Sequence, residues 1–171
     1  MLRYVIFLIL IPFSAFTQEA EPPMDYEQLG KIIFVLDPDA VPQGNGFLIH
    51  INSVPVLIAT DPTADRMRAM VHIGSAADLS PEDILRMMQA NFDSALDARY
   101  AVANGSLWAT FIHPLSPLEK NQFISGLAQT VNIAQTYGTL YSGGALLYGG
   151  GDSETLQRDL IEELLKKGEE L

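Results

Sequence analysis

The fold is decided by residues 47–73, which read FLIHINSVPVLIATDPTADRMRAMVHI. Apolar residues alternate with other residues in three short runs, and the turn sequences Asn52-Ser53 and Asp61-Pro62-Thr63 separate these runs. Because successive side chains of a strand point to opposite faces, this period of two predicts an antiparallel meander with one buried face. Pro55 has no amide hydrogen, so we expect it at the start of its strand or on a sheet edge.

The same alternation divides the side chains of residues 47–73 between two faces of the predicted sheet. The side chains that we expect in the core are Phe47, Ile49, Ile51, Val54, Val56, Ile58, Met67, Ala69, Val71 and Ile73. The opposite, outer face receives a methionine and the basic residues of this region: His50, Arg66, Arg68, Met70 and His72. The pattern therefore predicts a positively charged outer face.

A helix is predicted before this sheet, over residues 24–36. Its apolar residues have the spacing i, i+3, i+4 and i+7 of one helix face: Leu29, Ile32, Ile33 and Leu36. Asp37-Pro38 ends the pattern because the residue before a proline avoids the helical region. Residues 32–35 alone could also form a strand, and residues 42–46 are predicted to be a loop.

The best-marked helix begins at Ser80. Ser80 is the expected N-cap, Pro81 takes the first helical position, and Asp83 follows three residues after the cap. The apolar stripe predicted to face the core is Ile84, Met87, Met88, Phe92 and Leu96. Asn91 lies on the same side and is predicted to be a hydrogen-bonded core amide that ties the helix to a neighbouring loop. The alternative is a groove residue that binds the backbone of a ligand.

A β-hairpin is predicted over residues 99–103 and 106–113, around the strong turn signal Asn104-Gly105. In its second strand we expect Leu107, Ala109 and Phe111 in the core. The residues between them then join the outer face: Trp108, Thr110 and Ile112.

The last long helix is predicted to begin at Ser116-Pro117-Leu118-Glu119, a capping box with a proline at the first helical position, and to end near Tyr137. Residues 142–152 are glycine-rich and are predicted to be a flexible linker to an acidic amphipathic helix over 153–167. Strands grouped between helices indicate an α+β fold with an antiparallel sheet of about five strands, in the order α-β-β-β-α-β-β-α plus the tethered C-terminal helix. We expect one domain over residues 24–141.

The N-terminus has the layout of a secretory signal peptide. Arg3 precedes an apolar run over residues 5–13, and small residues follow, so we expect cleavage after Thr17 or after Ala20. The run is shorter than the ~20 residues that span a bilayer, so no stable membrane span is expected after cleavage. An uncleaved anchor or a buried N-terminal strand is the alternative. Residues 1–17 are thus the predicted signal peptide and 18–23 a mobile leader, and the protein is expected to be exported from a bacterium, to the periplasm or the exterior.

Composition excludes several classes of function. The 171 residues include 10 Lys and Arg, 21 Asp and Glu and no cysteine, and the formal net charge is −11. A chain without cysteine has no disulfides, zinc–thiolate sites, iron–sulfur clusters or thiol nucleophile. The acidic balance argues against binding to a nucleic-acid backbone.

Three stretches carry a resemblance to known proteins: Met87-Met88-Gln89-Ala90-Asn91-Phe92, Gly105-Ser106-Leu107-Trp108 and Pro114-Leu115-Ser116-Pro117-Leu118. Through them the chain resembles the superfamily of class I type III secretion chaperones and the related YbjN-type sensory transduction regulators. The resemblance covers about residues 24–141. It implies the helix and strand order given above, and a non-enzymatic, often dimeric module that binds a polypeptide segment along its surface. Those chaperones are cytoplasmic, whereas this chain has the pattern of an exported protein.

The candidate partner-binding residues are His50, Arg66, Arg68, Met70, His72 and Trp108. A cationic and aromatic sheet face can accept an acidic or extended segment, and Trp and Arg are favoured at interface hot spots. The alternative is a solvated face whose arginines pair with nearby acids. We expect the acidic C-terminal helix to dock over this face, because its leucines need a cover and its charge is complementary.

No catalytic or cofactor site is predicted. The three histidines lack the spacing of a metal site, and no paired acid and base or activated nucleophile is visible, so we expect no metal, no cofactor and no enzymatic activity. The first hypothesis is an exported module that binds a protein or peptide, with a homodimer suggested by the resemblance. The second is a periplasmic sensory module that holds a small anionic ligand through Arg66, Arg68, His50 and His72.

Overall fold

The computed structural model describes residues 21–93, 95–137 and 154–169. The helices are α1 (Tyr26–Leu36), α2 (Pro81–Asp93), α3 (Lys120–Gln135) and α4 (Glu154–Gly168), with a short 3-10 turn η1 (Ala76–Asp78). The strands are β1 (Val41–Gln43), β2 (Gly46–Ile51), β3 (Val54–Asp61), β4 (Arg66–Ser75), β5 (Arg99–Ala103) and β6 (Ser106–Pro114). The predicted α+β class and element order are confirmed, with β1 as an additional strand. The proposed signal peptide (1–17) and the glycine-rich linker (142–152) lie outside the described residues.

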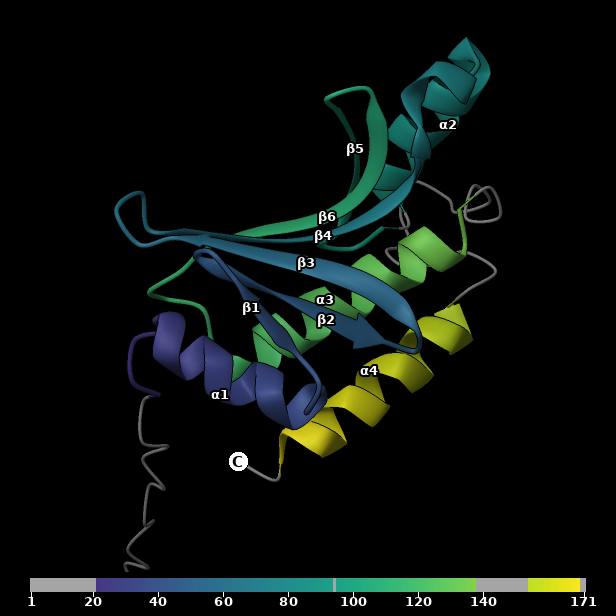
Figure 1. Ribbon diagram of the computed structural model, residues 1–171. Helices are drawn as coiled ribbons and strands as arrows, with labels where there is room; N and C mark the ends of the chain where they lie inside the picture. The colour runs from purple at the N-terminus through teal and green to yellow at the C-terminus, as the bar shows by residue number, and fades with distance from the viewer. Residues whose placement is uncertain (1–20, 94, 138–153, 170–171) are drawn as a thin grey trace, which may run out of the picture.

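The sheet is antiparallel throughout, with the strand order β1-β2-β3-β4-β6-β5. Strands β2, β3 and β4 form the meander predicted from residues 47–73, and Pro55 lies near the start of β3. Helices α1, α3 and α4 lie on one side of the sheet, and α2 stands beyond its β5 end (Figure 1). The core is the layer between these three helices and the inner face of the sheet.

The turns explain why a segment predicted to be a loop belongs to the sheet. Gly44 has a φ of 60°, so Gly44-Asn45 forms a two-residue hairpin turn of type II′ that pairs residues 41–43 with β2. The loop predicted over residues 42–46 is therefore only the turn Gly44-Asn45, and the rest of it belongs to strands β1 and β2. The turns at Asn52-Ser53 and Asn104-Gly105 have positive φ at both residues, which is type I′, and both were expected as turns.

Helix α3 forms the centre of the helical layer. Its Gly126 packs directly against the ring of Phe111 on β6, where an added Cβ would lie 2.6 Å from the ring. Phe123, Ile124 and Leu127 on the same helix are fully buried. The close approach of α3 to the sheet thus needs a residue without a side chain at position 126.

Helix α3 begins one turn later than predicted. Ser116 does not cap it, because the backbone amide and hydroxyl of Ser116 donate to the Asp65 carboxylate at 2.7 and 2.9 Å. The helix starts instead after Glu119, whose amide donates to the Gln122 side chain at 3.1 Å. The cap was misplaced because Asp65, 51 residues away, competes for the serine.

Helix α2 begins as predicted: the Asp83 amide donates to the Ser80 hydroxyl at 3.1 Å, and the Ser80 amide donates to the Asp83 carboxylate at 3.0 Å. Its predicted core stripe is wrong. Met87 is buried, but Ile84, Met88 and Phe92 are 46%, 61% and 67% exposed, and Leu96 is half-buried in a turn beyond the end of the helix at Asp93. Because α2 stands at the end of the sheet, only a narrow side of the helix contacts β5.

Two side-chain amides fix the outer border of β5. Asn91 of α2 accepts from the Tyr100 amide at 2.8 Å and donates to the Tyr100 carbonyl at 3.1 Å. Gln129 of α3 accepts from the amides of Asp97 and Ala98 at 2.8 and 3.2 Å. Asn91 is therefore paired, as predicted, although it binds a strand rather than a loop.

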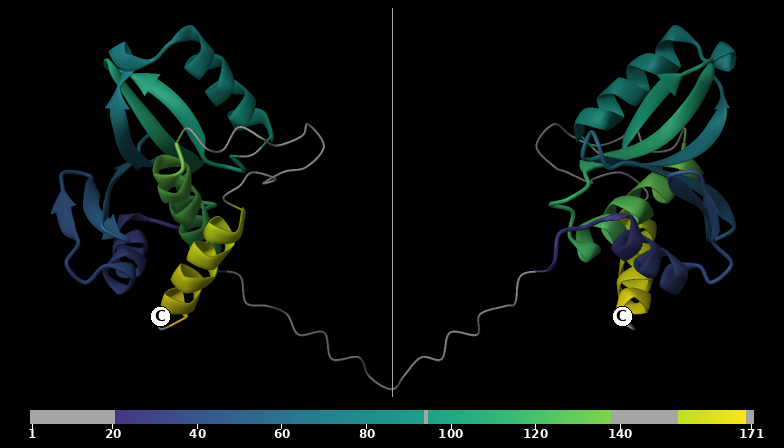
Figure 2. Two further views of the ribbon diagram at one scale, coloured as in Figure 1. Left: turned by 90° about the vertical axis from the view of Figure 1, so that its right-hand side faces the viewer. Right: turned by 60° about the vertical axis from the view of Figure 1, so that its left-hand side comes forward.

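Helix α4 packs against α3 and α1, on the side of the sheet opposite the predicted cationic face (Figure 2). Leu160 and Leu164 are buried there, and the Lys120 ammonium donates to the Gly168 carbonyl at 3.0 Å. The expectation that this helix docks over the cationic face is wrong, because the apolar helical layer covers its leucines. Along the chain segments that the structure describes, no helix has the length and apolar character needed to cross a membrane.

We predict that Gln129→Leu lowers the free energy of unfolding by about 2 kcal/mol, because two backbone amides lose their acceptor and the amide of Ala98 is buried. Urea unfolding followed by circular dichroism measures this. The control is Gln135→Leu at an exposed position of the same helix, which should change stability by less than about 0.5 kcal/mol. Equal losses in the two variants would contradict the role of Gln129.

The Asp65–Ser116 contact predicts a dependence of stability on pH. The hydrogen bonds from the Ser116 amide and hydroxyl lower the pKa of the Asp65 carboxyl. A carboxyl with a lowered pKa stabilises the fold above its unfolded pKa of about 3.9, and this stabilisation is lost as the pH falls through the lower folded value. Asp65→Asn should therefore show a smaller fall in melting temperature between about pH 5 and pH 2.5 than the unmodified chain. The exposed Asp39→Asn should retain the full fall; a matching reduction there would refute the assignment.

Candidate functional site

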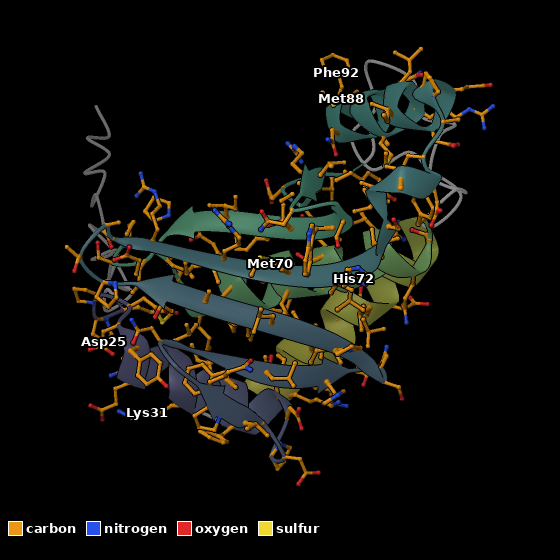
Figure 3. All side chains as sticks on the ribbon, turned by 45° about the horizontal axis from the view of Figure 1, so that its top comes forward. Asp25, Lys31, Met70, His72, Met88 and Phe92 are labelled. Carbon is orange, nitrogen blue, oxygen red and sulfur yellow. The ribbon has the colours of Figure 1, made fainter. Side chains whose placement is uncertain are left out.

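The outer face of the sheet is the face that the described helices leave uncovered (Figure 3). Cross-strand pairing joins one row of side chains across all six strands of this face: Val41, Leu48, Leu57, Met70, Thr110 and Arg99. The middle of the row is apolar, and no charged side chain lies in it until Arg99 on β5. The outer face is thus an apolar band with polar groups at its sides.

All six residues predicted for partner binding lie on this face. His50, Arg66, Arg68 and His72 are exposed, and Met70 and Trp108 are half-buried. The burial of β4 alternates as the period of two requires, so Arg66 and Arg68 point to the same side. Figure 3 shows Met70 and His72 on the face turned toward the viewer.

The basic residues do not converge on one point. Arg66 and Arg68 are two residues apart on β4, about 7 Å, and His72 is four further residues from Arg68, about 13 Å. His50 is on β2, which β3 separates from β4, so the two histidines are about 10 Å apart. The imidazole of His72 instead contacts the Trp108 indole edge-on, with ring centroids 5.2 Å apart.

The two arginines have different surroundings. Arg66 lies opposite Asp61 on β3, and its guanidinium donates to the Asp65 carbonyl at 2.8 Å. Arg68 lies between Ala59 on β3 and Ile112 on β6, so no carboxylate stands at either cross-strand position. Arg68 therefore presents its charge next to apolar side chains.

Three shallow hollows adjoin one another on and beside this face. The central one, about 480 Å³, is lined by Leu57, Arg68, Met70, Ala101, Ala103, Asn104, Trp108, Thr110 and Ile112. A second, about 410 Å³, lies around Arg66 and Arg68, and a third, about 530 Å³, lies between the end of β6 and α3. Ile112 lines all three, so the hollows adjoin one another around this side chain.

Sequence reasoning placed Thr110 and Ile112 on the outer face but gave them no role, and it did not single out Leu57. Alternation could show that these side chains share a face with the arginines. It could not show that Ile112 joins the hollows, because that depends on the register between β4 and β6. The apolar centre of the site was therefore missed.

A second exposed apolar surface lies on α2. Its side chains, with their exposed fractions, are Ile84 (46%), Leu85 (69%), Met88 (61%) and Phe92 (67%). Met88 and Phe92 project from the helix, away from the sheet (Figure 3). Four large apolar side chains on one helix make a patch of the kind that marks protein interaction sites.

Within residues 21–93, 95–137 and 154–169, no group of three or more potential ligands among His, Asp and Glu is placed to hold a metal ion. Some acidic side chains of the described residues form salt bridges on helix surfaces, such as Glu27–Lys31 at 3.2 Å and Glu82–Arg86 at 2.7 Å. The outer face therefore offers apolar contact, hydrogen-bonding side chains, and the guanidinium of Arg68, whose cross-strand neighbours are uncharged.

No protein-family model matches the chain, and no curated protein matches it in sequence. Among solved structures, it is similar to a chain in the structure of the HopA1–SchA chaperone–effector complex, with a TM-score of 0.50 and 11% sequence identity. The match covers 67% of this chain and 98% of the other. The chain therefore has the α+β fold predicted from its resemblance to the type III secretion chaperones.

Proposed function

We propose that the chain is an exported, non-enzymatic module that binds an extended protein or peptide segment on the outer face of its sheet. The observation that carries the proposal is the group of hollows that adjoin around Ile112, where apolar side chains lie beside the exposed Arg68. Its fold is similar to that of a chain from a chaperone–effector complex, which supports a protein partner.

The apolar band gives the proposed partner its chemistry. Leu57, Met70 and Ile112 offer contact area for aliphatic or aromatic side chains, and Arg68 offers a charge-assisted hydrogen bond to a carboxylate. The net charge of −11 repels an acidic partner at long range, but salt screens this repulsion beyond about 8 Å. A segment with apolar residues and a small number of acidic ones therefore fits better than a polyacidic one.

A small anionic ligand fits less well. An ion the size of a phosphate needs donors that converge within hydrogen-bond distance of it, and His50, Arg68 and His72 are spread over about 10–13 Å. Only Arg66 and Arg68 are close enough to share one group. In the alternative of a sensory module, His50 and His72 therefore lie too far from the two arginines to bind the same small anion.

Export is proposed from the N-terminal pattern of Arg3, the apolar run over residues 5–13 and the small residues that follow. The absence of cysteine from the chain is compatible with an oxidising compartment. In this proposal the mature chain, without residues 1–17, acts in the periplasm or outside the cell.

Two copies of the chain are proposed to pair through α2. Ile84 lies four residues before Met88 and Phe92 lies four residues after it, so the apolar stripe is symmetric about Met88. In an antiparallel pair with a two-fold axis at Met88, Ile84 of one copy meets Phe92 of the other. The stripe is thus complementary to itself, as a two-fold interface requires.

Charge reversal tests the binding face. A random 12-residue peptide library displayed on phage is selected on the full chain, and the dissociation constants of enriched peptides are measured by calorimetry. The double variant Arg66→Glu/Arg68→Glu should weaken binding roughly ten-fold or more, whereas Lys31→Glu, on exposed α1, should have no effect. Equal binding by all three proteins, or no enrichment at all, would contradict the proposed function.

Met88→Asp tests the pairing of two copies. Analytical ultracentrifugation at about 100 µM should show a dimer for the unmodified chain and a monomer for the variant, because two carboxylates would meet at the two-fold axis. The matched control is Gln135→Asp, which adds the same charge at an exposed position of α3, outside the α2 patch, and should remain a dimer. A monomeric unmodified chain would contradict the pairing.

A further inference from the structure

We infer that the central hollow of the outer face is an anchor pocket for one large apolar side chain of the bound segment. Thr110 donates a hydrogen bond to the backbone of that segment, and Arg68 pairs with a carboxylate of a neighbouring residue in it. The inference rests on the proposed function and deepens it. It names the position where the segment is held and the chemistry that selects it.

The hollow is formed by an alternation of large and small side chains between strands. Met70 on β4 and Trp108 on β6 form its high walls, and Leu57 on β3 continues the apolar surface. The two β5 residues that line the hollow are small: Ala101 lies opposite Trp108, and Ala103 lies opposite Ser106. The volume of about 480 Å³ is in the range of sites that bury a ligand group.

Thr110 provides a second, independent observation. Its side chain lines the hollow and is 92% buried, since only 8% of it is exposed, and its hydroxyl oxygen has no hydrogen-bond partner among the described residues. Buried hydroxyl groups are normally paired, because desolvation without a partner is unfavourable. Valine has nearly the same shape and would avoid this penalty. The hydroxyl oxygen is itself buried in the free chain, so in this proposal the bound segment reaches it when a neighbouring side chain of the hollow moves aside.

Arg68 defines what lies beside the anchor. It lines both the central hollow and the neighbouring one, and its cross-strand neighbours Ala59 and Ile112 carry no charge. Its guanidinium can reach a carboxylate on the bound segment without breaking an ion pair with either neighbour. The predicted recognition element is thus one leucine, methionine or phenylalanine, with an aspartate or glutamate one or two residues away.

Substitutions that affect only the hollow test this inference with the peptides enriched on the full chain. Ala101→Phe should fill the hollow and weaken binding roughly ten-fold, and Thr110→Val should weaken it about five-fold by removing the hydroxyl alone. The matched controls are Ala77→Phe and Thr63→Val, both at exposed positions outside the hollow, and they should bind as the unmodified chain does. The enriched peptides should contain the apolar and acidic pair described above.

Thr110→Val also separates recognition from folding. Because it removes a buried, unpartnered hydroxyl, its melting temperature should be equal to or higher than that of the unmodified chain while its affinity falls. If Thr110 had only a structural role, Thr110→Val would lower both the melting temperature and the affinity, or neither.

The outcomes distinguish the two proposals. If enriched peptides respond to Arg66→Glu/Arg68→Glu but not to Ala101→Phe or Thr110→Val, the anchor pocket is refuted and the binding face remains. If no peptide is enriched, or none responds to any of these variants, both proposals fail. A double-mutant cycle tests the ion pair: the acidic residue of the peptide is changed to its amide (Asp→Asn or Glu→Gln), and Arg68→Gln is made in the chain. If the two changes lower the affinity independently, so that their binding free energies add, the assigned ion pair is wrong.

Discussion

The packing of α3 on one face of the sheet is the contact on which the rest of the molecule depends. Gly126 lets the helix approach the ring of Phe111 so closely that no side chain fits between them, and the fully buried residues of α3 fill the layer around that contact. Helices α1 and α4 then pack beside α3 on the same side, so the apolar surfaces of the three helices are buried against one another and against that face of the sheet. The described helices leave the other face of the sheet uncovered, and a segment bound there, as proposed, would add a layer over its apolar band.

The sequence predicts this division well where it depends on local spacing. The period of two in residues 47–73 correctly separates core side chains from outer ones, and Ser80, Asn104 and Gly105 mark real boundaries. It fails where the outcome depends on distant contacts. The stripe of α2 that contains Met88 is apolar enough for a core, but its position beyond β5 leaves that stripe exposed.

The site shows the same limit. The arginines could be assigned to a face from their positions alone, whereas the hollow beside them could not. The predicted turn at Asn104-Gly105 already pairs Ala101 with Trp108. What it does not give is the register of β6 against β4, which places Met70 and Arg68 beside them and completes the hollow. The unpaired hydroxyl of Thr110 likewise becomes visible only when its neighbours are known. The two proposed surfaces lie on different elements, the outer face on the strands and the apolar patch on α2.

The side-chain amide of Asn91 has a consequence for the behaviour of the chain at high concentration. It forms hydrogen bonds with both the backbone amide and the carbonyl of Tyr100 on the unpaired edge of β5, as a further strand would. At the opposite edge of the sheet, Pro42 on β1 has no amide hydrogen to donate. Fibrous aggregates grow by adding strands to uninterrupted borders of this kind. Both edges of the sheet are thus poor templates for a further strand, which disfavours growth of the chain into fibres through its own strands.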